Sequence, residues 1–342
     1  MNTNQQMNPV RRDAMRKLLV EEVQHSTGPL ETPNATGRTT NRALGMRKRF
    51  PRRAFMLAAA AVLVGGVVAT GTVGFPGAAG VASAAAAEVL ENAAIKTIQT
   101  ADPIVTAGQY LKVSTTLVST FETDGPDGNM IFAQAKEGMD TYVPGNLNAE
   151  WVLARPRTEL INAYGISAEF FTSMQKDFDV SGEVVRAKNG EFYGPDKAGP
   201  KDEPTAQYLA SLPRDPKDLL KTIRSHTKGQ GQSADGQVLV FVADLLNSHR
   251  VPAELRASLY RAVALVPTID VIERQATIDG RMGVSVGYLE KSSGIRRELI
   301  IDPATGTLIG ERKVVTEAGS DFPVGTVSGW STTRATVTET AP

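Results

Sequence analysis

Histidine is the side chain that most often acts as a general base at neutral pH, and this chain has three: His25, His226 and His249. His25 lies in a basic N-terminal region. His226 and His249 stand at the predicted ends of helices, where a histidine cation interacts well with the last carbonyl groups. We therefore expect both of them on the surface, in structural rather than catalytic roles.

No sequence motif for catalysis accompanies these histidines. The sequence has no G-x-S-x-G elbow, no phosphate-binding glycine loop and no His/Asp cluster with metal-ligand spacing. The absence of cysteine excludes thiol nucleophiles, disulfides and cysteine-ligated zinc. The acidic loop Asp124–Asn129 lacks the ligand spacing and the terminal Glu of a calcium loop, so we expect a turn there. These features predict a protein that is not an enzyme, with no catalytic residue, no cofactor and no metal site.

An uncharged apolar segment, Ala54–Phe75, is the strongest localisation signal. At ~1.5 Å per residue, a helix of this length crosses a hydrocarbon core of roughly 30 Å. Five basic residues lie between Arg47 and Arg53, whereas the next charge after the segment is Glu88. The positive-inside rule therefore places the N-terminus in the cytoplasm. We predict a single-pass transmembrane helix over 54–75 in a bacterial cell membrane, between a cytoplasmic tail (1–53) and an extracytoplasmic domain (76–342).

A cleaved export signal is the alternative interpretation of the same region. Arg52 and Arg53 resemble the twin-arginine motif, and Ala82–Ala84 has the small-residue pattern of a signal-peptidase site. However, Pro51 occupies a position where that motif usually has Ser or Thr, and the region before the apolar run is much longer than in a signal peptide. We therefore favour an anchor that is not cleaved.

The N-terminal tail is basic, with eleven Lys and Arg against four Asp and Glu in residues 1–53, while the rest of the chain is acidic. No aromatic residue precedes Phe50, so the tail lacks a stacking platform and we expect no nucleic-acid partner. Most of the tail has the composition of a disordered chain, but residues 10–23 have helical apolar spacing. This short amphipathic helix is either frayed and unpartnered or a binding face for a cytoplasmic partner, formed by Val10, Ala14, Leu18, Leu19 and Val23.

The extracytoplasmic part is predicted to alternate between strands and helices. A helix is expected over 84–99, a hairpin over 109–122 and 130–135, a strand over 150–154, three helices between 215 and 266, and strands over 269–278, 284–289, 295–301 and 307–315. Short turns join the last four strands, so these strands should form an antiparallel meander. Gly306 should take a positive φ where it closes one of the turns. The predicted fold class is α+β, with a curved antiparallel sheet covered by helices, preceded by one transmembrane helix and a mostly disordered tail.

Several of these segments carry a resemblance over essentially the whole chain. They are Tyr208–Pro216, Leu255–Arg261, Leu265–Pro267, Asp279–Gly283 and Ile301–Gly306. The sequence resembles an actinobacterial family of single-pass membrane proteins with no assigned activity, whose genes often stand beside those of extracytoplasmic-function sigma factors. The Ile-Asp-Pro-x-Thr-Gly turn is also similar to the half-barrel sheets of lipoprotein carriers and of anti-sigma regulatory proteins.

Two functions follow from this resemblance. In the first, the extracytoplasmic domain senses a signal and a cytoplasmic sigma factor binds the tail, although the zinc-binding anti-sigma signature of histidine and paired cysteines is absent. In the second, a membrane-anchored protein carries or chaperones an extracytoplasmic lipid or lipoprotein ligand.

Overall fold

A computed structural model describes residues 82–178, 182–192, 204–317 and 322–342. Its strands form one antiparallel sheet of ten strands in the order β5-β3-β2-β1-β10-β9-β8-β7-β6, with β4 paired to β2. The strands are β1 (Tyr110–Asp124), β2 (Met130–Pro144), β3 (Glu150–Arg155), β4 (Glu159–Ala163), β5 (Glu183–Lys188), β6 (Asp270–Ile278), β7 (Arg281–Glu290), β8 (Ile295–Ile301), β9 (Leu308–Val315) and β10 (Val327–Thr338).

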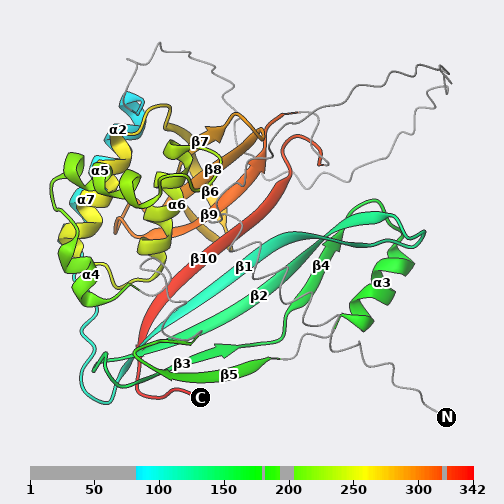
Figure 1. The fold of residues 1–342 in the computed structure, drawn as a ribbon, viewed down its shortest axis with the longest axis horizontal. Coiled ribbons are helices and arrows are strands. Elements are labelled where there is room, and N and C mark those ends of the chain that lie inside the picture. The colour runs from blue at the N-terminus through cyan, green and yellow to red at the C-terminus, as the bar shows by residue number, and fades with distance from the viewer. Residues whose placement is uncertain (1–81, 179–181, 193–203, 318–321) are drawn as a thin grey trace, which may run out of the picture. The chain divides into compact units, whose positions relative to one another are not determined.

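Six helices are described, and five of them gather on the half of the sheet that contains β6 to β9 (Figure 1). They are α2 (Ala84–Gln99), α4 (Ala206–Ser211), α5 (Pro216–His226), α6 (Ala234–Asn247) and α7 (Ala253–Ala264). The sixth helix, α3 (Ala168–Asp177), lies beside β4 in the other half (Figure 1). The main core is therefore not central to the sheet. It lies between this helix group and one face of β7, β8 and β9, with Leu90, Leu245, Leu259 and Leu299 almost fully buried.

The helix boundaries follow from local chemistry. Asp215 caps α5, because its carboxylate accepts the backbone N–H groups of Lys217 and Asp218, and Pro216 follows at the first helical position. By contrast, α7 begins after Pro252, which has no capping side chain. Asp102, from the segment before β1, accepts the Ala253 N–H at 3.3 Å and so serves as a cap that is remote in the sequence.

The sheet curls at the end formed by β6 and β7. Two strands separate β7 from β10 in the sheet order, yet Arg281, the first residue of β7, donates to the carbonyl oxygen of Thr333 in β10 at 3.0 Å. In the β6–β7 turn, the Asp279 carboxylate accepts the Thr332 hydroxyl of β10 at 3.1 Å. The pairing of β6 with β7 shifts register twice, around Glu273. Such irregularities increase the local twist and allow this hairpin to bend back across its neighbours.

Strand pairing shows which side chains share the helix-covered face. Leu299 of β8, in the main core, pairs with Glu311 of β9; Glu311 pairs with Ser331 of β10, and Ser331 pairs with Leu117 of β1. Directly paired residues point to the same side of a sheet. This face, which we call the helix face, therefore continues without interruption from the C-terminal strands into the N-terminal ones.

The predicted fold class is wrong in its proportions and in its transmembrane part. Helices do not cover the sheet as a layer, because the four-strand meander is only one end of a ten-stranded sheet whose N-terminal half carries α3 alone. None of the helices in the described ranges is long and apolar enough to cross a membrane, which corrects the prediction of a transmembrane helix. The segment 54–75 on which that prediction was based lies outside the described residues.

Most individual elements agree with the sequence analysis. The β1–β2 hairpin, the start of α5 and strands β6 to β9 are confirmed, and Gly306 has a φ of +71°. Four elements between β3 and α5 were not predicted, namely β4, α3, β5 and α4, and neither was the last strand, β10.

Gly306 offers a test of how the meander packs against α2. A Cβ atom at this position would overlap the backbone carbonyl of Ala93 and lie 2.9 Å from the nitrogen of Thr97. Gly280 has the same φ of +71° but open space around it. We expect Gly280→Ala to lower the free energy of unfolding by about 1 kcal/mol, for its φ alone, and Gly306→Ala to lower it by at least about 3 kcal/mol. Chemical denaturation of both variants measures the difference, and equal losses would contradict the close packing.

Candidate functional site

A compact apolar cluster lies on the helix face of the N-terminal strands, away from the main core. It consists of Leu111 and Val113 of β1, Val143 of β2 and Trp151 of β3, and we call it the Trp151 patch. Leu111 pairs with Val143, and the neighbouring β10 residue Ala335 pairs with Val113 and packs against the patch. The patch is thus a flat apolar surface on adjacent strands, with no charged side chain among its members.

Irregular segments, rather than helices, contribute the groups that pack on this patch. Val105 comes from the segment between α2 and β1, and Phe192 from the residues after β5. The guanidinium carbon of Arg250, in the loop between α6 and α7, lies 4.5 Å from the centre of the Trp151 ring, as in a cation–π contact. Loops open at lower free energy than packed helices do, so this cover is more easily displaced than that of the main core.

Trp151 itself is held firmly at the centre of the patch. It is 2% exposed, and its indole N–H donates to the carbonyl oxygen of Leu147 at 2.9 Å. Gly190, with a φ of +76°, lies against the ring so closely that a Cβ atom there would be 2.7 Å from it. The position of the ring is therefore fixed by β3 and the turn after β5, and what can vary is the cover provided by the loops.

The loop that carries Arg250 is attached to the sheet by the residue before it. His249 follows Ser248, the C-cap residue of α6, and has a φ of +52°, a conformation that glycine usually supplies at a helix end. Its Nε2 lies 2.9 Å from the hydroxyl of Thr333 in β10, whose hydroxyl also contacts Asn247 at 3.3 Å. This side-chain contact holds the His249 ring against β10.

Burial holds the pKa of His249 well below its usual range, at about 4, and the positive charges of Arg256 and Arg281 lower it further. The imidazole is therefore neutral near pH 7. Arg256 is held by an ion pair with Asp102 at 2.6 Å, and Arg281 donates to the carbonyl oxygens of Thr333 and Ile309. The site thus combines an apolar patch with a neutral imidazole between two fixed cations.

The structure corrects one expectation about the histidines. His226 is exposed at the end of α5, next to the rings of Tyr208 and Phe241, in agreement with the sequence analysis. His249 is not a freely exposed surface residue, because the sheet and the α6–α7 loop enclose much of its ring. Its position near the end of α6 was visible in the sequence, but its contact with a strand more than eighty residues away was not.

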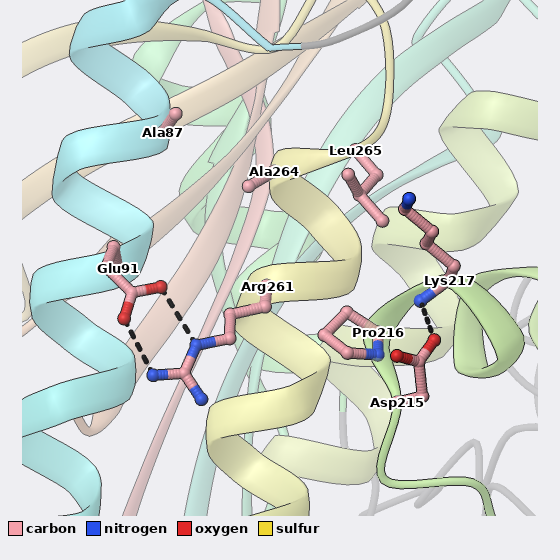
Figure 2. A pocket seen from close by; sticks show the side chains of 8 residues that line it. All are labelled: Ala87, Glu91, Asp215, Pro216, Lys217, Arg261, Ala264 and Leu265. Carbon is pink, nitrogen blue, oxygen red and sulfur yellow. Dashed lines mark hydrogen bonds and ion pairs between the residues drawn. The ribbon is translucent and has the colours of Figure 1, made fainter.

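Two open depressions lie elsewhere, and neither gathers groups for catalysis. The first has a volume of about 370 Å³ (Figure 2), and its lining consists of Ala87, Glu91, Asp215, Pro216, Lys217, Arg261, Ala264 and Leu265. Three of its charged side chains are already engaged: Arg261 forms a bidentate pair with Glu91, and Asp215 caps α5. The second, of about 360 Å³, follows one side of α5 from Asp218 to His226. Within the described ranges, no three His, Cys, Asp or Glu residues are grouped as metal ligands.

The predicted partner-binding face of the tail, Val10, Ala14, Leu18, Leu19 and Val23, lies outside the described residues. The sequence analysis did not single out the residues that meet at the Trp151 patch. The one available signal was the short strand at Glu150–Arg155 with a tryptophan at its start, which matches β3.

Comparison with known proteins gives little further guidance. No model of a known protein family matches the chain, and no curated protein matches it. Among solved structures, the chain is similar to the crystal structure of a DUF1329 family protein from Desulfovibrio piger, with a TM-score of 0.16 and 10% sequence identity. The match covers 73% of this chain and 92% of that one. A TM-score this low does not establish a common fold.

The contact between Arg250 and Trp151 can be measured with a double-mutant cycle. We expect Arg250→Ala and Trp151→Leu to show a coupling of about 0.5–1 kcal/mol in the free energy of unfolding, because each variant alone removes the same cation–π contact. Trp330 provides the matched control. It is next to Ser331 in β10, and because side chains alternate along a strand it lies on the face opposite to the helix face. Arg250→Ala and Trp330→Leu should be additive, and equal coupling in both cycles would refute a specific contact.

Proposed function

We propose that this protein is a non-enzymatic carrier that binds the acyl chain of a lipid, or of a lipid-modified protein, on the Trp151 patch. The observation that carries the proposal is the apolar surface of Leu111, Val113, Val143 and Trp151 on the helix face, covered by loops instead of helices. An extended acyl chain needs apolar area rather than a deep cavity. Each buried methylene group contributes about 0.8 kcal/mol to such binding.

The charges around the patch also suit a lipid. Arg250 lies directly over the patch, and a guanidinium group forms bidentate hydrogen bonds with phosphate or carboxylate groups. A ligand with an acyl chain and an anionic group could therefore replace the loop contacts with Trp151 and engage Arg250 at the same time. The two depressions suit such a ligand less well, since their polar groups belong to surface ion pairs, helix ends or one side of α5.

An extracytoplasmic location stays part of this proposal, because the sequence reasoning for it is not tested by the described residues. The sigma-factor partner also stays a prediction, since the tail segment on which it depends lies outside them.

The two tryptophans of the chain allow a direct test. In the full-length Trp330→Phe variant only Trp151 fluoresces, and a brominated fatty acid added as monomer should quench most of its emission, because bromine quenches only on contact. In the matched Trp151→Phe variant, the remaining Trp330 lies on the opposite face and should keep its emission. Quenching in neither variant, or equally in both, would contradict binding at the patch.

Competition then distinguishes the source of the acyl chain. A free phospholipid and a synthetic acylated lipopeptide are each titrated against the bound brominated probe. Displacement by the lipopeptide at a markedly lower concentration indicates a lipid-modified protein as the ligand. Displacement by the phospholipid at the lower concentration indicates a membrane lipid.

A further inference from the structure

We propose that residues Ser248–Pro252 form a latch over the Trp151 patch, which is closed while His249 is neutral and opens when His249 is protonated. This inference deepens the proposed function and rests on it for the identity of the site that the latch covers. It adds a regulation by pH, so that a ligand gains access to the patch under acidic conditions.

The first element of the latch is the direct link between its cover and its attachment. Arg250 makes the contact with Trp151, and His249, the adjacent residue, makes the contact with Thr333. Because the two residues share a peptide bond, movement of His249 away from the sheet also moves the backbone that carries Arg250. The loop is also fixed at its far end, where Val251 is buried in the main core and accepts a hydrogen bond from Arg256.

The second element is the backbone conformation of His249. Its φ of +52° is uncommon for residues other than glycine, although histidine adopts it more often than most residues do. The contact with Thr333 holds the side chain against β10 in this conformation. A latch residue held on the sheet by one side-chain contact is suited to release, since loss of that contact frees the loop.

The third element is the charge around the imidazole ring. Because Thr333 donates its single hydroxyl proton to the Asn247 side chain, the Nε2–H of His249 donates to Thr333, and a second proton must add at Nδ1. Of the cations that act on the ring, Arg256 comes from α7 and Arg281 from β7. Of the carboxylates near these cations, Asp102 pairs with Arg256, and Asp279 accepts from Thr332. A protonated ring would therefore be repelled by the charges of Arg256 and Arg281.

The low pKa of His249, about 4, agrees with this geometry and sets the pH range. In the open loop the ring is solvated and its pKa returns to the ordinary value near 6.5. Between these values the open form binds more protons than the closed form does, so acid favours opening. With these two pKa values, proton binding to His249 raises the ratio of open to closed latch about 20-fold when the pH falls from 7 to 5.

Hydrogen exchange of the full-length protein tests the latch without any ligand. Protection factors of the Ser248, His249 and Arg250 amides, corrected for the intrinsic pH effect, should fall about 20-fold from pH 7 to pH 5. His249→Asn is the matched variant, since asparagine tolerates a positive φ and does not titrate. Its protection factors should change little over this range. An equal fall in both proteins, or no fall in the wild type, would overturn the proposal. His249→Gly provides a second variant without a titrating group.

A second measurement separates the failure of the latch from that of the proposed function. Quenching of Trp151 by the brominated fatty acid is compared at pH 7 and pH 5 in the Trp330→Phe protein, with and without His249→Asn. Tighter binding at pH 5 only with His249 present supports both proposals. Exchange that rises in acid without quenching at either pH supports the latch and refutes the carrier function. Quenching that is equally strong at both pH values, with unchanged exchange, refutes the latch alone.

Discussion

The pairing of β1 with β10 is the interaction on which the rest of this structure depends. Tyr110 lies opposite Thr338, and the ladder continues as far as Val118 and Trp330. Without it, the chain would form two separate sheets, one from β1 to β5 and one from β6 to β10. With it, the helix face is continuous, and a loop from the helix group can reach a tryptophan on β3. The site is therefore a product of one long-range antiparallel ladder.

Elements that depend on neighbouring residues could be predicted from the sequence. The turns of the meander contain their own glycines and prolines, and α5 has its cap and its first-turn proline in adjacent positions, so both follow from local chemistry. The last strand, β10, could not be found in the same way. Its sequence is rich in serine and threonine, and its burial does not alternate regularly. Its place in the sheet is decided by partners on both sides rather than by its own apolar pattern.

The candidate site could be predicted only in part, for a related reason. The residues that meet there come from β1, β2 and β3, from the α6–α7 loop and from β10, so segments that are distant in the sequence come together at the site. A histidine at a helix end, considered alone, is expected on the protein surface, since such positions are usually solvated. What reverses that interpretation for His249 is its contact with Thr333, a residue of β10 that is distant in the sequence.

The irregular edge strand β6 has a further consequence for how the chain avoids aggregation. Its two register shifts and its charged residues, such as Glu273 and Arg274, make it a poor template for a strand of another molecule. Before the final ladder forms, however, β1 and β10 are themselves long regular edges, of 15 and 12 residues. Closing a ladder between segments so far apart is slow compared with forming local hairpins. The partly folded chain is thus protected from intermolecular pairing at β6 and vulnerable to it at the two strands that must find each other last.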